Sequence, residues 1–268
     1  MPRAPLSFSG VISAAALVVF LSACSNQPVD KTANMSPSTL YSEAKAEMSN
    51  SQWDKAVPYL EKLESRAAGT PLAQQAQLDR AYAHYKALEP VQALATLERF
   101  MRLHPASPAL DYALYLKAII NFNDDLGMFS NVTRQDLSER DQKAAKESWE
   151  AFNELVTRFP DSTYAPDSRQ RMAYIVNTLA QYEVHVARYY YKRGAYLAAA
   201  NRAQAAVADY REAPAIEEAL FILVKSYEGL GMHQLRDDAR RVLEKNYPSS
   251  EFLTFGEKRD QAPWWKVW

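Results

Sequence analysis

The sequence predicts an all-α solenoid of about five helical pairs, and two observations support this fold class. The chain of 268 residues contains only 7 glycines, while Ala, Leu, Glu, Gln, Lys and Arg dominate its interior, and this usage favours helices over strands. Prolines recur at the ends of the predicted pairs: Pro71 and Pro105 are 34 residues apart, as are Pro214 and Pro248. That spacing is the period of the tetratricopeptide repeat, a helix–turn–helix unit.

Small residues follow the same repeat. Alanines stand 12 residues apart where the two helices of a pair would touch, in the pairs Ala44 and Ala56, Ala81 and Ala93, and Ala187 and Ala199. Two helices approach closely only where side chains are small, and bulky neighbours fill the groove around the contact. We therefore expect most aromatic side chains between residues 40 and 247 to belong to the core.

The repeat divides the chain into five helical pairs. They cover residues 38–69, 71–104, 105–159, 160–213 and 214–247. We group them as N-terminal repeats 1–3 (residues 38–160) and C-terminal repeats 4–5 (residues 161–258). The helical pattern breaks at about residues 122–137, which predicts an exposed insertion. Residues 168–193 contain no Gly or Pro, which predicts one helix of about 25 residues.

The first residues have the pattern of a targeting signal. Arg3 precedes an apolar run over residues 11–23, and this run is shorter than the roughly 20 apolar residues that a membrane-spanning helix needs. We interpret residues 1–23 as a signal peptide. Residues 24–37 are polar and contain two prolines, so they predict a flexible tether ahead of the repeats.

The signal ends in Leu21-Ser22-Ala23-Cys24, which resembles a bacterial lipobox. The resemblance implies that Cys24 carries a diacylglycerol and an N-acyl chain, and that the serine after it directs the protein to the outer membrane. Cys24 is the only cysteine, so it has no partner for an intramolecular disulfide. The alternative is an ordinary secretory signal that happens to contain a cysteine.

Composition and motifs give no indication of catalysis or of nucleic-acid binding. The net charge is −1, and the four histidines, His84, His104, His185 and His233, form no His-x-x-x-His pair for a metal. No phosphate-binding loop or Gly-x-Ser-x-Gly motif is present, so we predict a non-enzymatic protein without cofactor or metal. Glycan cleavage by a pair of carboxylates stays an open alternative, because two acids that are distant in the sequence can lie close together in the folded chain.

One further set of features points to a family. Pro-x-Ser junctions occur at residues 105–107, 160–162 and 248–250, and residues 186–196 read Val-Ala-Arg-Tyr-Tyr-Tyr-Lys-Arg-Gly-Ala-Tyr. Together with the lipobox and the five units, these motifs resemble the BamD family, the lipoproteins of the outer-membrane β-barrel assembly machinery. The resemblance covers the mature chain apart from its last residues.

The resemblance implies a periplasm-facing protein whose partners are proteins. In the family's pattern, C-terminal repeats bind a periplasmic domain of BamA, N-terminal repeats bind unfolded β-barrel precursors, and other lipoproteins of the machinery join the complex. Carried over by position, Tyr189, Arg193 and Arg202 fall where the family's BamA-facing or function-linked residues lie, and the alternative for Arg202 is a solvated arginine on a helix. We expect the precursor to contact Tyr41, Tyr82 and Tyr85, although packing within the repeats is the alternative for all three.

The chain departs from the family's pattern at residues 259–268. This aromatic tail contains Trp264, Trp265 and Trp268 beyond the last repeat. Such a segment can fold back onto the last repeat, bind a partner or lie at a membrane interface. A rival interpretation of the whole chain is another repeat-containing envelope lipoprotein that coordinates cell-wall synthesis or division, with the same anchor and solenoid but without the stretch at residues 186–196.

Overall fold

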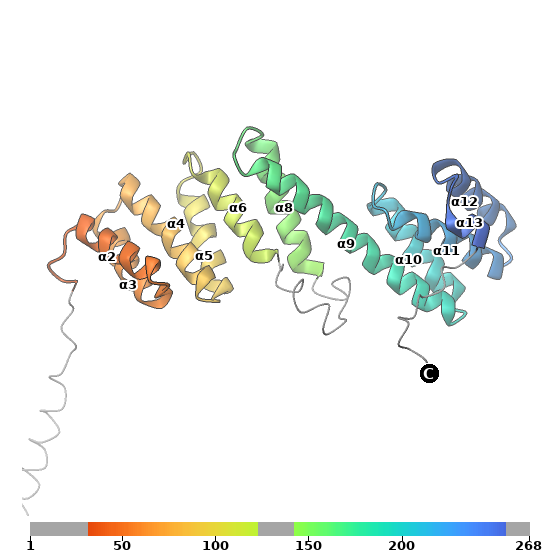
Figure 1. The fold of residues 1–268 in the computed structure, drawn as a ribbon, viewed down its shortest axis with the longest axis horizontal. Coiled ribbons are helices and arrows are strands. Elements are labelled where there is room, and N and C mark those ends of the chain that lie inside the picture. The colour runs from red at the N-terminus through yellow and green to blue at the C-terminus, as the bar shows by residue number, and fades with distance from the viewer. Residues whose placement is uncertain (1–31, 123–141, 256–268) are drawn as a thin grey trace, which may run out of the picture. The chain divides into compact units, whose positions relative to one another are not determined.

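The computed structural model describes residues 32–122 and 142–255, and within these ranges the fold is all-α (Figure 1). Eleven helices and no strand occur in the described ranges. In chain order they are α2 (Pro37–Ser49), α3 (Trp53–Arg66), α4 (Pro71–Lys86), α5 (Pro90–Leu103), α6 (Leu110–Asn121), α8 (Gln142–Arg158), α9 (Ala165–Lys192), α10 (Tyr196–Asp209), α11 (Ile216–Gly229), α12 (His233–Asn246) and α13 (Glu251–Phe255). None of the helices in the described part is long and apolar enough to cross a membrane.

Several predicted segments lie outside the described residues. They are the signal peptide at residues 1–23, the lipidation site Cys24 with most of its tether, nearly all of the insertion at residues 122–137, and the tail with Trp264, Trp265 and Trp268. They remain predictions from the sequence.

The all-α fold is confirmed, and contacts join the helices of the predicted pairs α2/α3, α6/α8, α9/α10 and α11/α12. The alanines that define the repeat, Ala44, Ala56, Ala81, Ala93, Ala187 and Ala199, are all fully buried. The long helix is also confirmed: α9 has 28 residues and begins at Ala165, three residues before the predicted start, because Pro166 is tolerated in the first turn of a helix.

Three repeat junctions share one turn, which explains the Pro-x-Ser motif. The backbone N–H of each junction serine donates to the carbonyl three residues earlier, from Ser107 to His104 (3.0 Å), Ser162 to Phe159 (3.1 Å) and Ser250 to Tyr247 (3.0 Å). Each serine Oγ then accepts the N–H two residues later, at 3.4 Å from Ala109, 3.2 Å from Tyr164 and 3.3 Å from Phe252. The serines therefore satisfy backbone groups that are left open where one helix ends and the next begins.

The chain divides into two compact units, residues 1–83 and 84–268, and each is described by itself. In the first unit, α2, α3 and most of α4 enclose a core built from Leu40, Leu60 and Leu63, with Trp53 and Tyr82 packed against it. The apolar side chains lie on the inner faces of the helices, as an amphipathic repeat requires.

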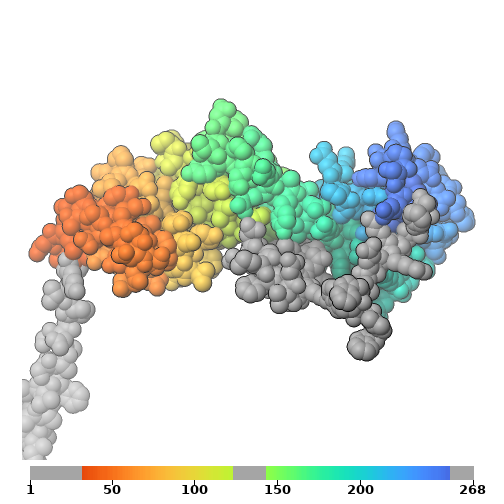
Figure 2. Space-filling model, in the orientation of Figure 1, coloured from red at the N-terminus to blue at the C-terminus, as the bar shows by residue number. Residues whose placement is uncertain are grey.

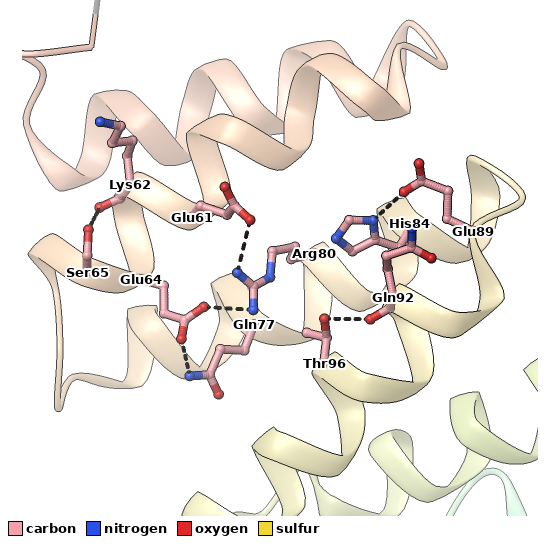
Figure 3. A network of polar contacts seen from close by, with 10 residues as sticks. All are labelled: Glu61, Lys62, Glu64, Ser65, Gln77, Arg80, His84, Glu89, Gln92 and Thr96. Atoms are coloured by element: carbon pink, nitrogen blue, oxygen red, sulfur yellow. Dashed lines mark hydrogen bonds and ion pairs between the residues drawn. The ribbon is translucent and has the colours of Figure 1, made fainter. Parts of the chain in front are cut away.

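A buried polar network joins α3 and α4 inside the first unit, and Figure 3 shows its members. The Arg80 guanidinium pairs with the carboxylates of Glu64 (3.2 Å) and Glu61 (3.5 Å), and the Gln77 amide donates to Glu64 at 2.8 Å. The side chains of Arg80 and Glu64 are only 12% and 10% exposed, whereas that of Glu61 is 55% exposed. Glu64 is therefore the buried partner on which the arginine depends.

In the second unit, consecutive helices lie beside one another, and the colours in Figure 2 pass from yellow through green to blue across its surface. Helix α9 packs against three other helices, α8, α10 and α11. The short helix α13 covers the end of the last pair, where Phe252 stacks on Phe221 with ring centroids 5.1 Å apart. This unit carries the three residues that the family resemblance assigned to BamA.

The buried network predicts unequal effects for its two glutamates. Glu64→Ala is expected to lower the free energy of unfolding by about 3 kcal/mol, because it leaves a buried guanidinium with one exposed partner. Glu61→Ala, the matched control, should cost no more than about 1 kcal/mol. Urea unfolding followed by circular dichroism measures both, and equal losses would contradict the importance of the buried contact.

Candidate partner-binding site

The most family-specific stretch of the sequence forms the turn between α9 and α10. Arg193 caps α9, and Gly194 after it has φ +73°, a left-handed conformation that glycine adopts without strain. The Gly194 N–H donates to the Tyr191 carbonyl at 2.9 Å, and the Ala195 N–H donates to the Tyr190 carbonyl at 3.0 Å. This is the Schellman pattern, which satisfies the last carbonyls of a helix.

Tyr196 closes the same turn against the next repeat. A Cβ added to Gly229, at the end of α11, would lie 2.6 Å from the Tyr196 ring, so α10 and α11 approach this closely only because position 229 is glycine. The roles of Gly194 and Tyr196 are therefore structural.

Two exposed residues of the stretch form a pair at the end of α9. Tyr189 is 52% exposed, and the Arg193 guanidinium lies 5.1 Å from the centroid of its ring, a cation–π contact. The Tyr190 ring contacts the Tyr189 ring edge to face, with centroids 5.8 Å apart. The structure thus brings two of the predicted partner-binding residues together, on a rigid helix end and facing solvent.

Arg202 occupies a different position, on α10. Its guanidinium pairs with the Glu183 carboxylate of α9 at 3.2 Å, with side-chain exposures of 46% and 13% respectively. Within the described chain Arg202 makes no ion pair or ring contact with Tyr189 or Arg193. Because of this ion pair, Arg202 already has a carboxylate partner in its own chain. The same Glu183 carboxylate also acts on Tyr210: burial raises the pKa of the Tyr210 hydroxyl, and Glu183 raises it further.

Sequence reasoning missed a second bridge in this region. Arg188 binds Glu218 through two parallel contacts, at 2.5 Å from Nε and 2.7 Å from the terminal nitrogen. Such a bidentate pair is stronger and more directional than a single contact. It joins α9 to α11 across 30 residues of sequence, and no local spacing could have indicated it.

In the first unit, the candidate Tyr41 belongs to a polar cluster between α2 and α4. The Lys45 ammonium lies 5.9 Å from the centroid of the Tyr41 ring and pairs with Asp79 at 3.5 Å. The Gln75 amide donates to the same Asp79 at 2.9 Å. Burial raises the pKa of the Tyr41 hydroxyl, and the Asp79 carboxylate raises it further.

The other two tyrosine candidates lie on α4. Tyr82 packs edge to face on Trp53, with centroids 5.7 Å apart, and both rings pack against the core of the first unit. Tyr85 falls in the second unit and is partly buried. Packing thus accounts for the position of Tyr82. Of the two candidates in the first unit, Tyr41 has the more polar surroundings.

Comparison with known proteins identifies the family. The profile of the YfiO family, described as an outer membrane lipoprotein, matches residues 33–243. A relative from Neisseria meningitidis serogroup A, named outer membrane protein assembly factor BamD, is 48% identical over 263 residues, which cover 96% of this chain and 98% of the relative. This chain belongs to the YfiO family. The resemblance drawn from the sequence motifs is confirmed.

More distant proteins are also similar to this chain. The assembly factor BamD of Vibrio cholerae is 33% identical over 223 residues, or 83% of this chain and 92% of its own. A solved structure of TPR-like repeats from Podosopora anserina covers 80% of this chain and 100% of its own at 16% identity, with a TM-score of 0.38. That likeness is too weak to support an argument.

The close approach at Gly229 predicts an effect that depends on Tyr196. Replacing a helical glycine by alanine ordinarily stabilises a protein by about 0.5–1 kcal/mol, but Gly229→Ala is expected to lower the free energy of unfolding by about 1–3 kcal/mol because the new methyl meets the ring. In a Tyr196→Ala background the same change should cost nothing. Chemical unfolding of the four variants in a double-mutant cycle measures this coupling.

Gly194→Ala is the control. It should destabilise by about 1–2 kcal/mol in either background, because its cost arises from the left-handed backbone and not from a neighbour. If Gly229→Ala were equally costly with and without the Tyr196 ring, the contact would not be the cause.

Proposed function

We propose that this protein is a non-enzymatic component of the machinery that assembles β-barrel proteins in the outer membrane. The observation that carries the proposal is the 48% identity to an outer membrane protein assembly factor across 96% of this chain and 98% of the relative. Identity over nearly the full length of both chains supports a shared role, since neither chain has a large part that the other lacks.

In this role the C-terminal repeats bind a periplasmic domain of BamA through Tyr189 and Arg193, with Arg202 beside them on α10. Tyrosine and arginine are enriched among residues that dominate binding energy at protein interfaces. The Schellman turn fixes the backbone of this helix end, so little conformational entropy is lost when a partner binds. A partner carboxylate at Arg202 would share the arginine with Glu183.

The N-terminal repeats receive unfolded β-barrel precursors, and other lipoproteins of the machinery complete the complex. Extended surfaces of stacked repeats suit unfolded polypeptides, which bind over a long contact. Tyr41 is the best placed of the predicted contacts in the first unit, because a cation and a carboxylate lie beside its ring. Tyr82 contributes through packing, and Tyr85 is a further predicted contact with the precursor.

The protein is held at the outer membrane, facing the periplasm, by a diacylglycerol and an N-acyl chain on Cys24. Each buried methylene contributes about 0.8 kcal/mol, and several chains together hold a protein far more firmly than one. The lipobox that ends at Cys24 supports this part of the proposal.

The BamA contact predicts loss of affinity on charge reversal. Arg193→Glu is expected to weaken binding to the purified periplasmic domains of BamA by about 2 kcal/mol or more, and Tyr189→Ala by about 1–2 kcal/mol, because both side chains are exposed and positioned for a partner. Isothermal titration calorimetry measures both. Arg241→Glu on α12, whose side chain is 73% exposed, is the matched control and should bind like the wild type.

Experiments on the complex with BamA also distinguish the assembly role from the rival interpretation, an envelope lipoprotein that coordinates cell-wall synthesis or division. Wild-type affinity of both variants would overturn the assignment of Tyr189 and Arg193. A pulldown from solubilised envelopes that recovers cell-wall synthases and no BamA would overturn the assembly role itself. Hydrolysis of purified peptidoglycan by the protein would overturn the proposed lack of enzymatic activity.

The lipid anchor predicts a change of location. Cys24→Ala should block lipidation, so a smaller fraction of the protein should sediment with outer membranes in sucrose gradients, held there only by its protein partners. Metabolic labelling with a palmitate analogue should mark the wild type and leave the variant unlabelled. Labelling of the variant would show that the lipid is attached elsewhere.

A further inference from the structure

The last helical pair exposes a group of apolar side chains at one end of the second unit. Ten large apolar or aromatic side chains are exposed in the described ranges, and four of them lie between residues 232 and 253. These four are Met232, Leu235, Val242 and Leu253, with exposed fractions between 38% and 46%. They belong to α12, to the residue that caps it and to α13, which lie at the same end of the second unit (Figure 1). Apolar exposure is therefore concentrated where the described repeats end.

Three of these side chains form a row along one side of α12. Leu235 and Val242 are seven residues apart, which is about two helical turns, and Met232 at the N-cap precedes Leu235 by three residues. The neighbouring side of the helix faces the core, since Leu243 is buried there and Ala239 packs against the same cluster. Met232, Leu235 and Val242, the α12 row, thus border the side of α12 that is already packed.

The end of a repeat stack normally differs from this arrangement. Each repeat buries its apolar surface against its neighbours, and a terminal repeat has a neighbour on one side only, so its outer face is usually polar. Helix α13 covers part of the end through the stacking of Phe252 on Phe221, but it has only five residues. The α12 row stays exposed beside it, and a contiguous apolar surface of this kind marks a place where another segment binds.

The sequence that follows α13 has the composition of such a segment. Residues 256–268 lie outside the described residues. Residues 256–261 read Gly-Glu-Lys-Arg-Asp-Gln, which is a polar connector, and residues 262–268 read Ala-Pro-Trp-Trp-Lys-Val-Trp. A tryptophan side chain can bury roughly 150–250 Å² of surface, so three of them are enough to cover a short helix face.

The connector is long enough to bring the tryptophans back over α12. Helix α12 ends at Asn246, and α13 begins at Glu251 and ends at Phe255, so the tail starts near the C-terminal end of α12. The 14 residues of α12 span about 21 Å. Residues 256–261 can span about 20 Å when extended. Both Leu235 and Val242 are therefore within reach of residues 262–268.

A segment of the same chain has an advantage over a free partner. A short flexible connector gives the attached segment an effective concentration in the millimolar range. Even a modest attraction between the tryptophan rings and the α12 row is then enough to keep the row covered. A second copy of the chain, a lipid surface or another protein would have to displace a segment that is always present.

We propose that residues 262–268 fold back onto α12 and cap the repeat stack, with tryptophan rings packed against Leu235 and Val242. The cap gives the fifth pair the covered outer face that its own residues do not supply. The α12 row lies on a helix other than the one that carries Tyr189 and Arg193, so the proposal does not depend on the proposed BamA contact.

¹⁹F NMR of residues 24–268, labelled with 5-fluorotryptophan, tests the proposal. The change Cys24→Ala removes the site of lipid attachment, so that no detergent is needed. Single Trp→Phe changes assign the resonances of Trp264, Trp265 and Trp268. A soluble gadolinium chelate is expected to enhance the relaxation of at least two of these resonances threefold less than that of free 5-fluorotryptophan, because packed rings are shielded from the solvent.

Two double variants locate the contact. Leu235→Asp with Val242→Asp should at least double the relaxation enhancement of the tail tryptophans, because charged groups replace the apolar row. The matched control is Val91→Asp with Leu103→Asp, two exposed apolar residues of α5, and it should leave the enhancement unchanged. Circular dichroism checks each fold. If the α12 variant unfolds, Leu235→Ala with Val242→Ala decides, with a smaller rise of at least 1.5-fold.

Several results would overturn the proposal. Tail tryptophans as accessible as the free amino acid would show that no cap forms, and shielding that persists in both α12 variants would place the tail elsewhere. Shielding that is lost on tenfold dilution would assign the row to a second copy of the chain. Shielding that arises only with phosphatidylethanolamine vesicles, or only with BamA periplasmic domains, would make the tail a membrane-binding or a partner-binding segment.

Discussion

The close approach of helices at small side chains is the constraint on which the rest of the structure depends. Fully buried alanines mark both helices of the pairs α2/α3 and α9/α10, and Gly229 takes the same role where α11 meets the Tyr196 ring. Because each pair is held this closely, its outer faces keep a fixed geometry, and exposed side chains such as Tyr189 are presented without further ordering. Binding surfaces on a repeat protein are thus a product of its internal packing.

The stretch at residues 186–196 shows how one family motif combines two tasks. Gly194 and Tyr196 shape the turn and its contact with the next repeat, whereas Tyr189 and Arg193 face solvent. Identity across the motif therefore does not by itself mark a binding site. Backbone conformation accounts for Gly194 and packing against Gly229 accounts for Tyr196, which leaves Tyr189 and Arg193 for a partner.

Local patterns predicted the fold well, and contacts between distant residues could not be predicted in the same way. Proline and alanine spacings gave the helical pairs because a repeat is a local unit, and the absence of Gly and Pro gave α9. The bridges from Arg188 to Glu218 and from Arg202 to Glu183 join helices 30 and 19 residues apart in sequence, and any exposed carboxylate could have been the partner.

Helix α9 links three successive helical pairs of the second unit. In a simple stack each repeat contacts only its neighbours, so parts of it can unfold one after another. The 28-residue α9 packs on α10 of its own pair and on α8 and α11 of the two neighbouring pairs, and the Arg188–Glu218 bridge strengthens the contact with the fifth pair. Opening of the fourth pair would therefore disturb the pairs on both sides, which makes this part of the chain one cooperative folding unit.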